Sequence, residues 1–138
     1  MAIYTVLKDK LGKILDPLIP RYEILRYDLI TDGQPVKTGR KVNGKDEFVK
    51  RITLSSFPNA TSKTFQTGIT NGKWVRHYIY MYVSDSSAWH LLPYHSLSAL
   101  NAGVNAVVSD DVSTITIQSG TDRRNLSGIA YIYFTYNS

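Results

Sequence analysis

Residues 112–136 of the chain read VSTITIQSGTDRRNLSGIAYIYFTY, and this stretch decides the fold class. In its first part Ile115 and Ile117 alternate with polar residues, which is the period-two pattern of a strand with one wet face. Its last part, residues 129–136, is apolar or aromatic on both faces and carries no charge. The connector at residues 119–128 is rich in Gly, Ser, Asn and Asp, which favour turns. The stretch therefore predicts a β-hairpin with an exposed, charged tip, and its second strand has to be covered on both faces.

Turn signals divide the rest of the chain into further short strands. Asn-Gly favours two-residue hairpin turns because both residues tolerate a positive φ angle, and the pair occurs at residues 43–44 and 71–72. Each pair predicts a hairpin, and residues 109–111 predict a third one. Pro93 cannot donate to a strand ladder and marks the end of a short edge strand at residues 88–92. The resulting set of about eight short strands predicts an all-β fold, an antiparallel β-sandwich of jelly-roll-like type.

The first 21 residues differ from the β-rich remainder. Apolar side chains in this region recur at helical spacing, but Gly12 and Pro17 interrupt the pattern. A short helix and an extended arm both remain open for residues 8–20. We therefore divide the chain into an N-terminal arm or attachment segment, residues 1–21, and a β-sandwich domain, residues 22–138. The arm either docks the protein onto a larger assembly or packs over an edge of its own domain.

Residues 73–83 form a long strand with one aliphatic and one aromatic face. Successive side chains of a strand point to opposite sides, so Val75, Ile79 and Met81 are assigned to the core. A row of aromatic side chains on the opposite face is too apolar to meet open solvent over that length. Three explanations remain open: a second sheet of the sandwich, a subunit interface, or a carbohydrate platform. The candidate oligomer interface consists of Trp74, Tyr78, Tyr80, Tyr82, Tyr131 and Tyr133.

The composition is that of one ordinary domain. The chain has 138 residues, and 43% of them are hydrophobic, which is enough to build a core without disulfides or bound metals. It contains no cysteine, so neither a disulfide framework nor a thiolate metal site is expected. The sequence opens without a basic lead and has no apolar run of membrane-spanning length, so we expect no secretory signal and no membrane partner.

The formal charge of +5 is concentrated in the first 51 residues, which hold 11 Lys/Arg and 7 Asp/Glu. Acidic residues are interspersed among the basic ones, as in Lys8-Asp9-Lys10, so no basic face is marked out. This distribution favours an ordinary solvated surface over a nucleic-acid interface. A nucleic-acid partner is therefore not expected.

The sequence contains no arrangement typical of catalysis. His77 lies within the long strand and faces its aliphatic side, while His90 and His95 are five residues apart around a proline and match no zinc spacing. The sequence has no phosphate-binding loop, no nucleophile elbow and no helical His-Glu pair. Asp110 and Asp111 share a turn and form no glycosidase pair. We therefore predict no enzyme, no catalytic residue, no metal site and no cofactor.

Two short pieces carry side chains suited to binding saccharides. Aromatic residues flank Pro93, and aromatic ring faces cover the C–H side of a sugar while polar neighbours bind its hydroxyls. The tip of the connector at residues 119–128 offers a carboxylate and two guanidinium groups, which bind in a bidentate manner. The alternatives are that Trp89 anchors the core and that Asp122 bonds to its own loop. The candidate ligand-binding residues are Trp89, His90, Tyr94, Asp122, Arg123 and Arg124.

Four sequence motifs occur in order along the β-rich part of the chain. They are residues 38–45 leading into residues 48–51, residues 54–68 with FPNAT at 57–61, LLPY at 91–94, and GTDRR at 120–124 followed by the terminal strand. In this order they resemble the C-terminal β-domain of tail and fibre proteins, of receptor-binding or head-fibre type, from phages of Gram-positive bacteria. The last motif has the form GSDRS in that family, and here Arg124 stands in place of the small residue. The resemblance extends from the region of residue 30 to the C-terminus.

The resemblance implies a structural and adhesive role in a bacteriophage virion that is assembled in the cytoplasm of the host bacterium. The protein is then a fibre or tail-tip domain and a homo-oligomer, a trimer, that contacts host cell-wall polysaccharide. Its N-terminal arm attaches it to other virion proteins. An architectural head-fibre or collar component without receptor binding is one alternative. A basic single-stranded nucleic-acid-binding protein that stacks bases on Trp74 and the tyrosines is a second alternative.

Overall fold

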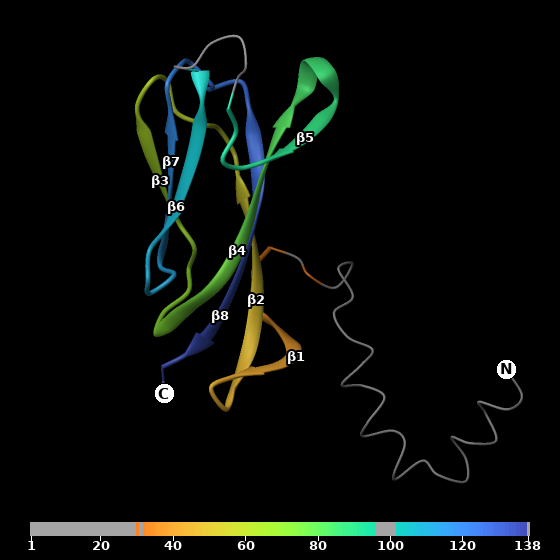
Figure 1. Ribbon diagram of the computed structural model, residues 1–138, viewed down its shortest axis with the longest axis vertical. Coiled ribbons are helices and arrows are strands. Elements are labelled where there is room, and N and C mark those ends of the chain that lie inside the picture. The colour runs from red at the N-terminus through yellow and green to blue at the C-terminus, as the bar shows by residue number, and fades with distance from the viewer. Residues whose placement is uncertain (1–29, 31, 96–101, 138) are drawn as a thin grey trace, which may run out of the picture.

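The computed structural model describes residue 30, residues 32–95 and residues 102–137, and these residues form eight strands in two sheets. The five-stranded sheet has the order β1-β2-β8-β4-β5, and the three-stranded sheet has the order β3-β7-β6. Neighbouring strands are antiparallel throughout, and the two sheets form two layers (Figure 1), so the predicted antiparallel β-sandwich is confirmed. The strands are β1 (Val36–Val42), β2 (Lys45–Leu54), β3 (Ser62–Gln66), β4 (Gly72–Val83), β5 (Ala88–Leu91), β6 (Val104–Val108), β7 (Thr114–Ser119) and β8 (Ser127–Tyr136).

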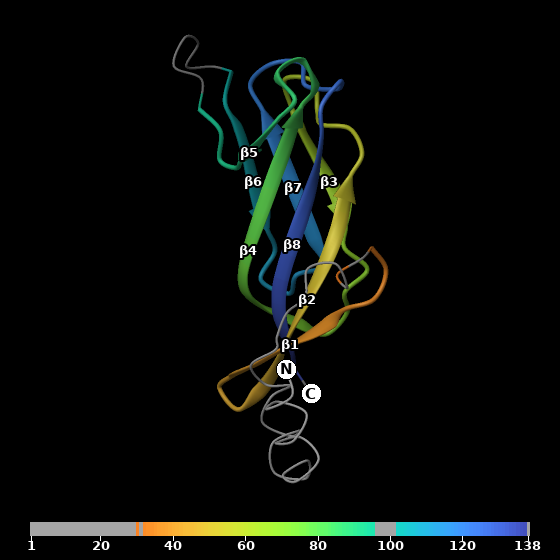
Figure 2. The same cartoon turned by 90° about the vertical axis from the view of Figure 1, so that its right-hand side faces the viewer.

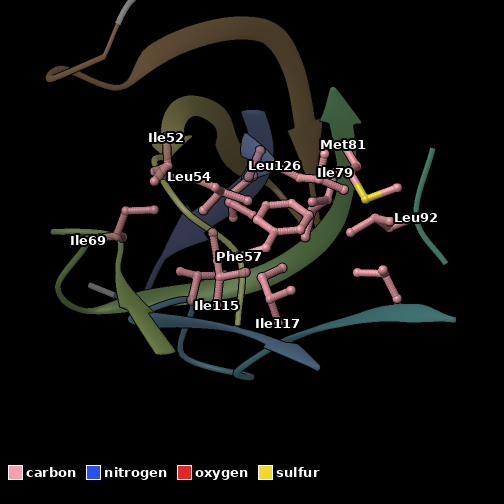
Figure 3. Packing of buried hydrophobic residues seen from close by; sticks show 14 of the residues in the cluster. Ile52, Leu54, Phe57, Ile69, Ile79, Met81, Leu92, Ile115, Ile117 and Leu126 are labelled. Carbon is pink, nitrogen blue, oxygen red and sulfur yellow. The ribbon is translucent and has the colours of Figure 1, made fainter. Parts of the chain in front are cut away.

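Apolar side chains from both sheets fill the space between the layers. Ile115 and Ile117 of β7 are fully buried and belong to the same cluster as Ile132 and Phe134 of β8. Phe57, from the connector between β2 and β3, points into the centre of this cluster (Figure 3). Thr116, which lies between these isoleucines, is only partly buried. The predicted alternation of this strand is therefore confirmed.

The connector between β7 and β8 does not form the predicted hairpin. β7 belongs to the three-stranded sheet and β8 to the five-stranded sheet, so residues 120–126 cross from one layer to the other. They are bonded to the chain that makes the opposite crossing from β2 to β3, because the Phe57 N–H donates to the Leu126 carbonyl at 3.1 Å. A local pattern gives the two faces of a strand but not its partners, and the partners of β8 are β2 and β4, both far away in the sequence. The hairpin prediction was wrong for this reason.

The two Asn-Gly pairs have different roles. At the first, Val42 pairs with Lys45 across two residues of positive φ, so the predicted hairpin between β1 and β2 is confirmed. The second predicted hairpin is wrong, because β3 and β4 lie in different sheets. Gly72 instead begins β4, where a Cβ atom would collide with the Val112 side chain. This glycine therefore permits close packing between the layers.

Residues 109–113 form the predicted third hairpin, which joins β6 to β7. The Asp111 carboxylate accepts hydrogen bonds from the Ser109 hydroxyl at 2.7 Å and from the Ser113 hydroxyl and N–H at 2.7 and 3.0 Å. These bonds, that of Ser109 above all, lower the pKa of Asp111 to about 2. Val112 is fully buried with a φ of 55°, in the left-handed region that β-branched residues rarely adopt. The hydrogen bonds from Ser109 and Ser113 to Asp111 hold Val112 in this conformation, and the turn closes one end of the core.

A β-bulge near the start of β4 exchanges the faces of two residues. Trp74 pairs with Phe134, but Arg76 already pairs with Tyr133, so Val75 is an extra residue on β4. One extra residue reverses the alternation of side chains on one side of the bulge. Val75 consequently leaves the main core and packs beside Tyr133 in a second cluster, while Trp74 leaves the tyrosine row. The predicted faces of Trp74 and Val75 were therefore wrong.

The predicted arm at residues 1–21 and the first part of the predicted β-domain, residues 22–29, lie outside the described residues. Ile30 is described and is only 1% exposed, and it clusters with Tyr133 on the side of the five-stranded sheet that is turned away from the three-stranded sheet. Figure 2 looks onto that side, with β4, β8 and β2 in front of the other layer. Within the described ranges, no helix is long and apolar enough to cross a membrane.

Candidate functional site

We call the side of the five-stranded sheet that faces the viewer in Figure 2, away from the three-stranded sheet, the outer face. Tyr78, Tyr80 and Tyr82 of β4 lie on it, because the alternating residues Ile79 and Met81 are buried in the core between the sheets. The second sheet therefore covers the aliphatic side of β4 and leaves the tyrosine side without it. The explanation that a second sheet covers the aromatic row was wrong, and a subunit interface and a carbohydrate platform remain.

An open groove of about 480 Å³ runs along the outer face. Its most exposed side chains are Trp89, at 52%, and Tyr78, at 42%. Its volume falls in the range of small-ligand sites, and aromatic linings of this kind suit ligands with both apolar and hydroxyl surface. The residues that line the groove are Tyr78, Tyr80, Trp89, Ile129, Tyr131 and Tyr133.

Cross-strand ring contacts fix the orientation of the groove tyrosines. The Tyr78 and Tyr133 ring centroids are 5.9 Å apart with the planes at 90°, and those of Tyr80 and Tyr131 are 6.4 Å apart at 80°. Edge-to-face packing of this type is favourable and leaves few alternative rotamers. The groove is therefore built on neighbouring strands with its rings already ordered.

A second, more polar hollow of about 270 Å³ adjoins the aromatic groove and shares Tyr78, Tyr80 and Tyr133 with it. Two arginines, Arg40 on β1 and Arg76 on β4, form the rest of its lining. The groove therefore changes along its length from an aromatic end on β5 to a cationic end beside β1.

An ion pair with a buried carboxylate neutralises one of these two arginines. Arg76 donates to Glu47 at 2.7 and 3.2 Å, and its guanidinium lies 4.0 Å from the Tyr133 ring centroid. The Glu47 side chain is fully buried and also accepts a 2.7 Å hydrogen bond from the Thr38 hydroxyl. Burial acts to lower the pKa of Arg76, but the hydrogen bonds and charge of Glu47 outweigh it and raise that pKa. The pair holds Arg76 against the Tyr133 ring and supports the floor of the groove.

Arg40 is the second arginine of the groove, and among the described residues it has no carboxylate partner comparable to Glu47. Its backbone N–H donates to the Thr38 hydroxyl at 3.2 Å, while its exposed guanidinium forms no ion pair with any residue that the structure describes. By contrast, Lys37 and Lys41 both lie 3.4 Å from the Asp46 carboxylate. Arg40 therefore brings an uncompensated positive charge to this end of the groove.

The structure separates the predicted ligand residues of β5. Trp89 pairs with Tyr82 and packs against it on the outer face, with ring centroids 5.0 Å apart. His90 pairs with Met81 on the opposite face, where its ring centroid lies 5.2 Å from that of Tyr94. Neighbouring residues of a strand point to opposite sides, so Trp89 cannot share a site with His90 and Tyr94. The alternative that Trp89 anchors the core was also wrong, since Trp89 is half exposed on the outer face.

The predicted charged tip bonds to its own loop and to its neighbours. The Arg124 guanidinium donates to the two Asp122 oxygens at 3.0 and 2.7 Å, and its backbone N–H donates at 3.1 Å. These bonds, led by those of the guanidinium, lower the pKa of Asp122 to about 2. Arg123 donates to the Ala102 carbonyl at 2.9 Å. The alternative that Asp122 bonds within its own loop is therefore confirmed, and this tip lies apart from the aromatic groove.

His77 serves the local structure of the bulge. Its Nδ1 accepts a 3.0 Å hydrogen bond from the Trp74 indole N–H, and burial lowers its pKa, which favours the neutral ring that can accept. Within residues 30, 32–95 and 102–137, no group of three or more His, Asp or Glu side chains is arranged to hold a metal ion.

Sequence reasoning missed Arg40, Arg76 and Glu47 as parts of this site. Alternation along β4 does place Arg76 on the tyrosine face once the bulge is known. The approach of Arg40 to the groove depends on β1 lying at the edge of the sheet that contains β4 and β8, and no local signal gives that order.

No family model, curated protein or solved structure matches the chain.

Proposed function

We propose that the protein is a structural virion protein of a bacteriophage, a fibre or tail-tip domain that attaches to the particle and contacts the host cell surface. The observation that carries the proposal is the ordered aromatic groove on the outer face, which the second sheet leaves open. A surface with this much aromatic area on a rigid β-scaffold is typical of recognition sites. The proposed contact is host cell-wall polysaccharide.

The placement of two sequence motifs supports the resemblance to phage tail and fibre domains. FPNAT at residues 57–61 and GTDRR at residues 120–124 form the two adjacent crossings between the sheets, where Asn59 bridges to Asp122. The Ala60 N–H also donates to the Thr121 carbonyl at 3.0 Å. The two motifs thus share one structural role, which gives a physical reason for their occurrence together.

Saccharide contact follows from the chemistry of the groove. The exposed Trp89 and Tyr78 rings offer flat apolar faces for the C–H side of a pyranose, and tyrosine hydroxyls can bond to its oxygens. The strands and the edge-to-face ring contacts order these groups before the ligand arrives, which reduces the entropic cost of binding. An adhesin that works at low affinity gains further from several copies on one particle.

Assembly forms the second part of the proposal. Trp89 and Leu91 are both about half exposed on β5, which is an edge strand, and such an edge is suited to burial against another copy. We expect a homo-oligomer, a trimer, with residues 1–21 attaching it to other virion proteins. Light scattering of the purified chain tests whether the homo-oligomer forms, and a stable monomer at micromolar concentration would contradict it.

The arm is tested by deletion. A protein that lacks residues 1–21 should keep its β-sandwich, judged by circular dichroism, and fail to incorporate into particles. Normal incorporation of the folded, shortened protein contradicts the attachment role.

Adsorption to host cell walls tests the function itself. Trp89→Ala and Tyr78→Ala should each weaken adsorption strongly while the thermal unfolding midpoint stays close to that of the unaltered protein. Val107→Ala is the matched control, because Val107 is an exposed apolar residue, at 56%, on β6 of the other sheet. Unchanged adsorption in both groove variants, with normal particle assembly, favours an architectural head-fibre or collar component instead.

A further inference from the structure

We infer that the groove on the outer face binds an anionic saccharide, with sugar rings against Trp89 and the tyrosines and an acidic group at Arg40. This inference rests on the proposed function, since it assigns a ligand class to the same groove. The acidic group is a carboxylate or a phosphate, because both match the planar fork of a guanidinium.

The aromatic hollow and the cationic hollow form one continuous groove. The aromatic hollow and the cationic hollow share three tyrosines, Tyr78, Tyr80 and Tyr133. A ligand that lies on these rings therefore reaches the guanidinium end without leaving the surface. A neutral glycan would use only the aromatic part of the groove.

The second step concerns the charges at the β1 end. Arg76 is neutralised by the fully buried Glu47, so its charge is compensated within the protein. Glu47 and Asp46 line a neighbouring hollow around Arg40, but both are engaged, Asp46 by Lys37 and Lys41. Neither the aromatic nor the cationic hollow is lined by a carboxylate. Arg40 therefore lacks a described counter-ion, and a ligand anion would supply one.

The third step distinguishes a saccharide from a nucleic acid. Affinity for a nucleic-acid backbone grows with the number of phosphates that Lys and Arg neutralise. The groove offers one uncompensated guanidinium, that of Arg40, because Arg76 is paired with Glu47 and the other lining residues are uncharged. A row of aromatic rings with one cation, Arg40, at its end suits a saccharide that carries one acidic group and several hydroxyls.

Calorimetric titration of the full chain with a matched pair of probes tests the inference. The probes are an oligosaccharide with a single terminal galacturonate and its methyl ester, which share one backbone and differ by one charge. We expect the free acid to bind about tenfold more tightly, which corresponds to one charge-assisted contact. Competition by galacturonate and by mannose 6-phosphate then distinguishes a carboxylate from a phosphate as the preferred group.

Two variants locate the charge effect. Arg40→Gln should abolish the preference for the acid and leave the affinity for the ester unchanged. Lys63→Gln removes the same charge from β3 of the other sheet and should change neither affinity. An equal effect of the two substitutions would show general attraction by a basic protein and overturn the inference.

The remaining outcomes are also decisive. Equal affinity for acid and ester, or no binding of the acid probe and of mannose 6-phosphate at millimolar concentration, overturns the anionic ligand. Tighter binding of an oligothymidylate, with a steep fall in added salt, assigns the groove to nucleic acid instead. Trp89→Ala distinguishes failure of this inference from failure of the proposed function. If this variant binds both probes and adsorbs to cell walls as the unaltered protein does, the groove is not the binding site. If the unaltered protein merely shows no preference for the acid, the proposed function still stands.

Discussion

The two faces of β8 are built from different kinds of apolar residue. Ala130, Ile132 and Phe134 point inward and are fully buried beneath the three-stranded sheet. Tyr131 and Tyr133 point outward, where Ile30 and the residues of β1 cover one part and the groove leaves the other part open. These three inward side chains have no polar atom to satisfy, whereas the outward tyrosines carry hydroxyl groups that tolerate water.

This difference separates stability from recognition within one strand. Close-packed aliphatic side chains lose the most when they are truncated, because the cavity that remains is not refilled. Half-exposed aromatic side chains contribute less to folding and keep their surface available for a partner. Substitutions on the inner face should therefore change the free energy of unfolding, and substitutions on the outer groove should change binding.

The largest effect is expected for Phe134→Ala on the inner face. Phe134 is fully buried and stacks near Phe48 and Tyr136, so its removal leaves a cavity between the sheets. We expect a loss of about 4 kcal/mol in the free energy of unfolding, measured by urea denaturation. A loss below that of the groove variants described below would contradict the division between the two faces.

The next effect concerns the ion pair under the groove. Glu47→Gln removes the charge that Arg76 requires and should lower the free energy of unfolding by about 2 kcal/mol. It should also loosen the Tyr133 ring, on which the Arg76 guanidinium lies. Asp46→Asn is the control, since it removes the neighbouring carboxylate from an exposed pair with two lysines. Equal destabilisation by the two substitutions would mean that burial of Glu47 has no energetic importance.

A smaller, pH-dependent effect is expected at the turn that closes the inner core. The folded-state pKa of Asp111 lies at about 2, below its ordinary value of 3.8, so its carboxylate stabilises the fold above that ordinary value and the contribution is lost as the pH falls towards 2. Asp111→Asn should lower the unfolding midpoint at neutral pH and converge with the unaltered protein near pH 2. Asp110→Asn removes a charge from the same turn without those three hydrogen bonds. Parallel pH profiles for the unaltered protein and Asp111→Asn would refute the role of Asp111.

The smallest effect on stability is expected for Trp89→Ala in the groove. Trp89 is 52% exposed and packs mainly on Tyr82, so the free energy of unfolding should change by less than about 1 kcal/mol. The same substitution should weaken adsorption to host cell walls strongly. A loss of stability comparable to that of Phe134→Ala would place Trp89 in the structural core and remove the contrast between the faces.

Much of the fold could be predicted from local patterns. The alternation of Ile115 and Ile117, the turn at residues 43–44 and the edge strand before Pro93 each depend on residues close together in the sequence. The assignment of Ile79 and Met81 to the core depends on the same local rule. Each of these predictions needed only the period of a strand or the φ preference of a turn.

The candidate site was predicted less well, for two physical reasons. The bulge at Val75 adds one residue to a strand, and a single added residue moves Trp74 to the other face. The grouping of Trp89 with His90 and Tyr94 followed nearness in sequence, although β5 sends adjacent side chains to opposite sides. Of the predicted interface residues, Tyr78, Tyr80, Tyr131 and Tyr133 do line one groove.

Local sequence patterns are enough to predict antiparallel strands with an aliphatic core and a surplus of aromatic residues. Those properties follow from alternation and turn chemistry, which are local. Three features depend on long-range packing: β7 and β8 lie in different sheets, Glu47 neutralises Arg76, and Arg40 lies beside the tyrosine groove. Strand order depends on which long-range pairings bury the most apolar surface, and that competition is settled by the whole chain at once.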